Sequence, residues 1–356
     1  MTSISDHSRD IPILTAVRAA ANKLAQHPQD HGWRDLYRLI GFGLSSSSPQ
    51  LRKLFLENAN SQRDSSATHL ITLLGISLKI VAVDLFDELR TKDKPESCLD
   101  SLEAVLAEHG DHIAAILSSR RNSFTGARRF LVPQVVLGAY FANGYPVDFA
   151  DLGTGLGVLP RQLNAQRLYN TFKTGLRWAG GTPSFQPIPL RSRFGVDQGP
   201  LPRIDWVRAC YGTSPYYEGL YRELMATFDD PDVRASEVGY SELDLLDTDD
   251  LRAFIRRNNI NAVNLSYTLY ELTPESRTRV IDTLLDVLRP PGVAIVTEPH
   301  AELTRPGCTV TVYDQSTASP MTIVTVSDGH FTGRVDPLPD YEQFTTLHPI
   351  TYEFAR

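Results

Sequence analysis

The chain has 356 residues, 42% of them hydrophobic and 22% charged, which is ordinary globular usage and excludes a chain that is disordered, collagen-like or coiled-coil throughout. At about 150 residues per domain, this length predicts roughly two domains. The 42 acidic residues outnumber the 35 Lys and Arg residues, and the formal charge of −7 leaves no excess of cations for phosphates, so we expect no nucleic acid partner.

The cysteines and the N-terminal residues bear on the cellular compartment. Cys98, Cys210 and Cys308 are widely spaced, which favours neither a disulfide framework nor a thiolate metal site. Residues 1–10 are polar and of mixed charge, without the apolar stretch of a secretory signal. We therefore expect a protein of the reducing cytoplasm that has no membrane partner.

The first part of the chain, from residue 11 to about 142, carries helical patterns. In residues 101–117, apolar residues recur at spacings of three and four, and Asp100 and Ser101 are suitable caps. No strand signal of comparable strength is present in this part. The pattern predicts an all-helical N-terminal domain over residues 1–142.

The most apolar run of the chain covers residues 70–86 and contains Lys79 and Asp84. It is too short to cross a bilayer comfortably, so we expect a buried helix. Polar runs at residues 45–49 and 91–96 suit connections between helices.

After Pro146, short apolar runs alternate with amphipathic stretches. The runs expected to be strands are 147–152, 194–196, 233–238, 262–265 and 293–296. The stretches expected to be helices are 216–228, 248–257 and 274–288. This alternation predicts an α/β fold in residues 143–356, with a mainly parallel, doubly wound sheet covered on both faces. Residues 308–313 and 321–326 flank a turn and predict an antiparallel hairpin at the sheet edge.

The sharpest motif is Asp-Leu-Gly-Thr-Gly-Leu-Gly over residues 151–157, at the end of the first expected strand and directly before a helix with Pro160 in its first turn. Glycines let the backbone turn tightly and approach a ligand, and a helix N-terminus presents free N–H groups. Dinucleotide sites usually show Gly-x-Gly-x-x-Gly with an acid about 20 residues later, whereas here Asp151 precedes alternating glycines. A glycine-rich turn without a ligand is the alternative.

This motif resembles the first motif of class I S-adenosylmethionine (SAM) enzymes, in which the acid helps to hold the methionine amine and the glycines accommodate the nucleoside. The resemblance implies SAM as the cofactor and a Rossmann-like methyltransferase domain over residues 143–356. The cofactor-binding residues that it implies are Asp151, Gly153, Thr154, Gly155 and Gly157.

The next two strand ends carry further polar residues. Asp197 ends the second expected strand, where a carboxylate can accept hydrogen bonds from both ribose hydroxyls of a nucleoside; simple solvation at a strand end is the alternative. Ser241 follows the third expected strand and is a candidate for adenine contact. The nearby Asp244 is equally suited to capping a helix.

Landmarks over roughly residues 100–290 resemble a methyltransferase-like family known only as a domain of unknown function. They are residues 102–109, 121–128, 194–197, 206–211 and 243–246. The resemblance implies a helical part joined to a class I methyltransferase fold, and it implies no substrate. An acid associated with the family is replaced here by Ser241, whereas the three loop glycines are closer to working methyltransferases.

Asn122 and Arg128 lie in a polar segment before the last helix of the N-terminal part. If that part folds over the strand ends, both side chains can reach the methionine carboxylate, a task to which a guanidinium is suited. Ordinary surface pairing is the alternative for Arg128. The tyrosine-rich residues 211–217 are a candidate lid.

The end of the fourth expected strand supplies the candidate catalytic residues. Asn264 and Tyr267 have the spacing of the Asn-Pro-Pro-Tyr motif of amine methyltransferases, although both prolines are missing. An amide oxygen can accept from an amine, and an aromatic face can stabilise a sulfonium or ammonium by about 0.5–2 kcal/mol. Ser266 and Tyr270 belong to the same segment. The alternative is that both tyrosines pack against the sheet.

The histidines add little. His300 follows the fifth expected strand and is a candidate base. His109 and His112 are one helical turn apart, but Glu108 and Asp111 favour an exposed helix face, so we expect no metal site.

The sequence therefore favours an enzyme that transfers the SAM methyl group to a small-molecule amine or hydroxyl. A second hypothesis is cyclisation of SAM to azetidine-2-carboxylate with release of methylthioadenosine, because azetidine-2-carboxylate synthases are similar to class I methyltransferases and a helical cover without an acceptor groove suits a closed reaction. Asn264, Ser266 and Tyr267 would assist it. A third is a catalytically silent nucleoside-binding module.

Overall fold

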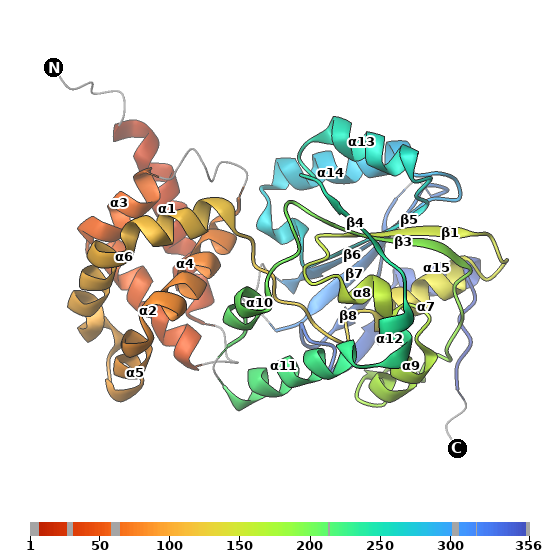
Figure 1. Ribbon diagram of the computed structural model, residues 1–356, viewed down its shortest axis with the longest axis horizontal. Helices are drawn as coiled ribbons and strands as arrows, with labels where there is room; N and C mark the ends of the chain where they lie inside the picture. Colours follow the sequence, from red (N-terminus) through yellow and green to blue (C-terminus); the bar gives the residue numbers. More distant parts are fainter. Residues whose placement is uncertain are drawn as a thin grey trace.

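The computed structural model describes residues 7–26, 31–57, 65–212, 214–300, 306–317 and 319–353. Within these ranges the protein is α/β, with a helical part on one side and a mixed sheet flanked by helices on the other (Figure 1). The helices of the helical part are α1 (His7–Leu24), α2 (His31–Ser45), α3 (Pro49–Glu57), α4 (Ala67–Val81), α5 (Val83–Thr91), the 3-10 helix η1 (Pro95–Cys98) and α6 (Leu99–Ser119).

The apolar run expected as one buried helix forms two, α4 and α5. Every residue of α4 from Thr68 to Leu78 is buried, and Ser66 caps the helix by accepting from the His69 N–H. No described helix is long and apolar enough to cross a membrane by itself. Helices α4 and α5 are long and apolar enough only when taken together, and the chain bends by 103° between them.

The remaining elements build the sheet part. Its strands are β1 (Val147–Leu152), β2 (Arg177–Trp178), β3 (Leu190–Asp197), β4 (Gly239–Glu242), β5 (Ala262–Ser266), β6 (Val293–Pro299), β7 (Cys308–Asp314), β8 (Met321–Val326) and β9 (Arg334–Pro337). Its helices are α7 (Leu131–Tyr140), α8 (Val158–Gln162), α9 (Gln166–Lys173), α10 (Ile204–Cys210), α11 (Pro215–Phe228), α12 (Pro231–Ala235), α13 (Thr248–Arg257), the 3-10 helix η2 (Leu269–Glu271), α14 (Pro274–Val287) and α15 (Asp340–Leu347).

The described strands form one sheet in the order β2-β9-β8-β7-β6-β5-β1-β3-β4. The strands from β4 to β6 in this order run parallel, whereas β7 and β8 continue the sheet as the predicted antiparallel pair. This pair is not the edge of the sheet, because β9 and β2 lie beyond it. After β1 the chain builds outward through β3 and β4, then returns to place β5 on the other side of β1. In open parallel sheets, ligands bind at this reversal, outside the carboxyl ends of the strands.

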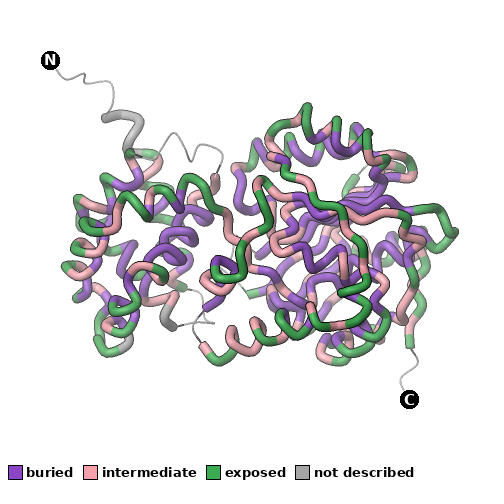
Figure 2. Tube along the Cα trace, viewed as in Figure 1, coloured by how far each residue is buried: buried purple, intermediate pink, exposed green. Residues whose placement is uncertain are grey.

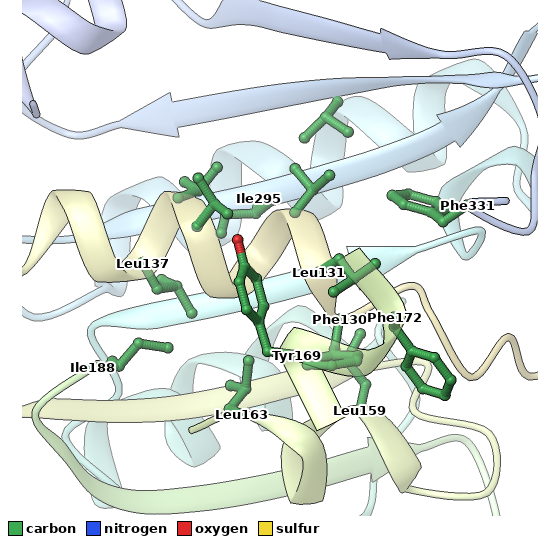
Figure 3. Packing of buried hydrophobic residues seen from close by; sticks show 14 of the residues in the cluster. Phe130, Leu131, Leu137, Leu159, Leu163, Tyr169, Phe172, Ile188, Ile295 and Phe331 are labelled. Atoms are coloured by element: carbon green, nitrogen blue, oxygen red, sulfur yellow. The ribbon is translucent and has the colours of Figure 1, made fainter. Parts of the chain in front are cut away.

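Alternating side chains of β1 enter two different apolar cores, as the period of a strand requires. Ala150 and Leu152 pack with α13 and α14, while Val147 and Phe149 pack with α7, α8 and α9. Figure 3 shows part of the core that contains Val147 and Phe149, in which Tyr169 lies among aliphatic residues. Figure 2 shows buried chain along the strands. Both faces of the sheet are therefore covered by helices.

The apolar packing separates the helical part near residue 120. Its core runs from Val17 to Leu117 and also takes in Trp206 and Cys210 of α10. Helix α7 instead packs on the sheet. The packing thus groups α7 with the sheet part, although the sequence placed residues 131–142 in the N-terminal domain.

One expected strand is wrong. Residues 233–238 begin in α12 and not in a strand, and the third parallel strand starts only at Gly239. Asp230 caps α12 by accepting from the Asp232 N–H, and Pro231 occupies its first turn. These capping signals outweigh the short apolar run that suggested a strand.

Candidate functional site

The loop after β1 requires glycine. Gly153, Gly155 and Gly157 have φ angles of +76°, +56° and +66°, in the left-handed region that other residues rarely adopt. A Cβ atom on Gly153 would also overlap with the Thr268 side chain. The loop therefore brings bare backbone to the carboxyl end of the sheet.

Asp151 lies beneath this loop and is only 4% exposed. One carboxylate oxygen accepts from the Asn264 amide at 2.7 Å and the other from the Thr154 hydroxyl at 2.8 Å. Burial raises the pKa of Asp151 to about 6 despite these two hydrogen bonds and the nearby Arg129. The site thus holds a carboxylate whose charge forms near neutral pH and which gains from a cationic partner.

Asp197 stands at the end of the neighbouring strand β3. Its carboxylate accepts from the Gly155 N–H and from the Gln198 N–H, both at 2.9 Å. Burial raises its pKa. Two acids 46 residues apart in sequence therefore flank the same glycine loop.

These groups border a partly open cavity, in which the space between the atoms, its open mouth included, amounts to about 940 Å³. We call it the first cavity. The residues lining it are 121–126, Arg129, Asp151, 153–155, Val158, Leu159, Asp197, Gln198, 243–246, 266–268, Glu271 and Leu272. The cavity lies at the topological reversal of the sheet.

The chain segment between α6 and α7 crosses this cavity. Asn122 donates from its amide to the Tyr270 hydroxyl at 3.1 Å. Arg121 donates to Gln198 and to Ser65, which holds the segment to both parts of the molecule. The segment that follows the helical part therefore supplies one wall of the first cavity.

Arg128, however, lies outside the cavity. Its guanidinium forms two hydrogen bonds to Glu223, at 2.9 and 2.6 Å, so the alternative of ordinary pairing is correct for this residue. The next residue, Arg129, lines the cavity instead and is 7% exposed. Nothing in the sequence distinguishes these adjacent arginines, because only the local backbone decides which side chain faces the strand ends.

Arg129 is a buried cation without an acidic partner among the described residues. It donates to the carbonyl oxygens of Phe124 and Gly329, and its guanidinium carbon lies 4.0 Å from the centroid of the Tyr267 ring. None of the described carboxylates lies within ion-pair distance of it. A buried charge of this kind favours an anionic ligand group.

The turn after β5 is strained and firmly held. Tyr267 has a φ of +57°, which is uncommon for a residue with a side chain. Glu298 accepts from the N–H groups of Thr268 and Leu269 at 3.3 and 3.0 Å, and burial raises its pKa to about 7. The Ser266 hydroxyl has no hydrogen-bond partner among the described residues and lies on the cavity wall.

The other sequence candidates take different places. Asn264 is fully buried behind Asp151 and does not reach the cavity, so it positions that acid. Tyr270 borders a second cavity. Ser241 and Gly157 lie outside the first cavity, and residues 243–246 stand where the adenine contact was expected from Ser241.

Several remaining expectations concern residues away from the first cavity. The His300 ring is 2.8 Å from the Thr325 hydroxyl, and this histidine does not line either cavity. Asp247, and not Asp244, caps α13. The cysteines are free and buried, and the described residues contain no group of three His, Cys, Asp or Glu residues placed to hold a metal.

A second, partly open cavity adjoins the first, and the space between its atoms, its open mouth included, amounts to about 1000 Å³. The residues that line both are Asn122, Phe124, Arg129 and Tyr267. Two spaces therefore meet at the turn after β5.

Comparisons with protein-family models and with curated proteins find no match to this chain. What is shown is an α/β protein with a mixed sheet and two adjoining cavities at the carboxyl ends of its parallel strands.

Proposed function

We propose that the protein binds SAM in the first cavity and transfers its methyl group to a small molecule. The proposal rests on the placement of Asp151 and Asp197. These two acids lie at the ends of adjacent strands and flank a loop whose backbone conformation favours glycine. The class I methyltransferase identity, the cofactor and the enzymatic activity are all parts of this proposal.

The residues present fit SAM group by group. Arg129 has no anionic partner in the described part of the chain and would hold the methionine carboxylate, while Asp151 would hold the amine. Asp197 keeps acceptor capacity beyond its two N–H bonds and would hold the ribose hydroxyls. The bare glycine backbone leaves room for the nucleoside, and residues 243–246 would border the adenine.

SAM brings an activated methyl group, so the protein has mainly to orient the acceptor and exclude water. The Tyr267 ring packs against the Arg129 guanidinium at 4.0 Å, which would help to orient the cation that holds the methionine carboxylate. Asn264 holds the Asp151 carboxylate in place, and Glu298 fixes the turn that carries Tyr267.

Methyl transfer is favoured over cyclisation because an acceptor has a place to bind. The cyclisation hypothesis drew on the absence of an acceptor groove, but a second cavity opens beside Tyr267. A reaction within one molecule of SAM needs no such space.

The experiment incubates the full chain with SAM alone and analyses the products by mass spectrometry. We expect no methylthioadenosine, and S-adenosylhomocysteine only after an acceptor is added. Methylthioadenosine from SAM alone would indicate cyclisation instead. Calorimetric titration with S-adenosylhomocysteine tests binding itself, and failure to bind would leave no basis for either reaction.

Asp197→Asn is the informative variant, since it removes the charge that we assign to the ribose hydroxyls. We expect at least tenfold weaker binding of S-adenosylhomocysteine. Glu242→Gln is the matched control, because Glu242 ends the next strand but is exposed and lies outside the cavity. Equal affinities for the two variants would contradict the assignment.

A further inference from the structure

The second cavity lies where the helical part meets the turn after β5. The helical part contributes Trp33 and Tyr37 from α2 and Thr72 and Ile76 from α4. The other described lining residues are Leu24, Asn122, Phe124, Arg129, Cys210, Gly212, Tyr217, Tyr267, Tyr270, Pro306, Gly307, Gly329 and His330. The cavity thus exists only because the two parts pack together.

Seven of the 17 described lining residues carry aromatic rings. Trp33 stacks on Tyr37 with ring centroids 5.8 Å apart. On the opposite segment, the His330 ring lies 4.9 Å from Phe124 and 5.7 Å from Tyr217. Flat ring faces of this kind favour a planar aromatic ligand, which can stack or meet them edge to face.

The charge of the wall separates neutral ligands from cations. The described lining contains no Asp or Glu, and its one permanent charge is the Arg129 guanidinium. Burial raises the pKa of the Cys210 thiol to about 12 and the pKa values of Tyr267 and Tyr270 well above their usual range, so these groups stay neutral. A buried ammonium group would find no carboxylate partner among the described lining residues.

Position links this cavity to the first one. Tyr267 and Arg129 border both spaces, so a ligand in the second cavity meets the first at the turn after β5.

His330 is the described lining side chain whose ordinary pKa is nearest to neutral pH.

We propose that the second cavity is the acceptor site and that it takes a neutral aromatic compound with a hydroxyl group, such as a phenol or a fused-ring compound with a phenolic hydroxyl group. This inference rests on the proposed methyl transfer and narrows its substrate class. The hydroxyl oxygen forms a bond to the methyl carbon as the carbon–sulfur bond breaks. The electron pair of that bond goes to sulfur, and the hydroxyl proton goes to the His330 imidazole.

The test uses 2-naphthol as a neutral probe and 2-naphthylmethylamine as a cationic probe of similar size. Each is titrated calorimetrically into the full chain saturated with S-adenosylhomocysteine. We expect 2-naphthol to bind at least tenfold more tightly than the amine. Tighter binding of the amine would overturn the substrate class.

Two substitutions on the same helix locate the probe. Ile76→Phe fills the second cavity, whereas Ile80→Phe makes the same change one turn later at a position that is 41% exposed and outside the cavity. We expect Ile76→Phe to weaken 2-naphthol binding about tenfold or more and Ile80→Phe to leave it unchanged. Unchanged affinity for S-adenosylhomocysteine in both variants verifies that they fold.

Further outcomes keep this inference distinct from the proposed function. If S-adenosylhomocysteine binds but 2-naphthol does not, or if Ile76→Phe has no effect on 2-naphthol, the acceptor site is wrong while SAM binding stands. If 2-naphthol binds to the ligand-free protein and S-adenosylhomocysteine does not bind, the acceptor role fails together with the methyltransferase proposal.

The role of His330 has its own readout. With 2-naphthol as acceptor, His330→Gln is expected to lower kcat with little change in KM and to remove the acid limb of the pH–rate profile. An unchanged profile would exclude His330 as the proton acceptor.

Discussion

Arg129 and Arg128 are adjacent in sequence but have different electrostatic surroundings. Arg128 is paired with Glu223, whereas the partners of the buried Arg129 among the described residues are carbonyl oxygens and aromatic rings. We predict that Arg129→Gln weakens S-adenosylhomocysteine binding more than tenfold, since the methionine carboxylate loses its cation. Arg128→Gln is the control and should leave that affinity unchanged. The reverse pattern in calorimetry would contradict our assignment of the carboxylate site.

Asp151 makes binding dependent on pH. Burial raises its pKa from 3.8 to about 6, and the carboxylate form is the one that attracts the amine of the ligand. We predict that affinity for S-adenosylhomocysteine rises as the pH rises through about 6, and that Asp151→Asn removes this dependence. A wild-type affinity that stays flat from about one pH unit below this pKa to about one unit above it would count against Asp151 as the amine ligand.

The same carboxyl group lowers the stability of the folded protein as the pH rises, although it strengthens ligand binding. The folded state holds the Asp151 proton more tightly than the unfolded chain does, so its contribution to stability is present at low pH and is lost as the pH rises from 3.8 to about 6. As the pH rises through this range without ligand, the unfolding free energy of the wild type should therefore fall relative to that of Asp151→Asn. Urea denaturation at several pH values measures it.

Among the structural elements, a comparison of two glycines distinguishes backbone strain from steric crowding of a Cβ atom. Gly144 and Gly153 both have a positive φ, but only Gly153 has no room for a Cβ atom. We predict that Gly144→Ala costs about 1–2 kcal/mol and that Gly153→Ala costs more and also weakens S-adenosylhomocysteine binding. Chemical denaturation and calorimetry on both variants test this. Equal stability losses without an effect on binding would mean that the loop does not need its tight turn.

The elements also show how far sequence reasoning reaches. The strands around 147–152, 262–265 and 293–296 were predictable because continuous apolar runs suit strands buried on both faces. The strand expected at 233–238 failed because Asp230 and Pro231 start a helix there. The short strands β2 and β9 lack a comparable apolar run and depend on pairing with distant segments.

The site was predictable to a similar degree. The motif identified Asp151 and the loop glycines, and the strand-end rule identified Asp197. Arg129 and the second cavity were not predictable, because they depend on side-chain direction and on how the helical part packs against the turn after β5.

At the scale of the whole molecule, a buried pair joins the two parts. His69 of α4 is fully buried and lies 3.4 Å from Glu271 of η2, whose side chain borders the first cavity. Burial raises the pKa of Glu271 and lowers that of His69, so both groups favour their neutral forms. We predict that Glu271→Gln, which imitates the neutral carboxyl, keeps most of the stability, whereas Glu271→Ala loses about 1–3 kcal/mol. Equal losses in urea denaturation would contradict a neutral pair.

The central claim is that the first cavity binds a sulfonium nucleoside, and the most direct measurement is a crystal structure of the full chain grown with S-adenosylhomocysteine. Our account predicts the ribose hydroxyls on Asp197, the amine on Asp151 and the carboxylate on Arg129. A first cavity that stays empty in crystals grown at saturating ligand, or a ligand bound elsewhere, would contradict it.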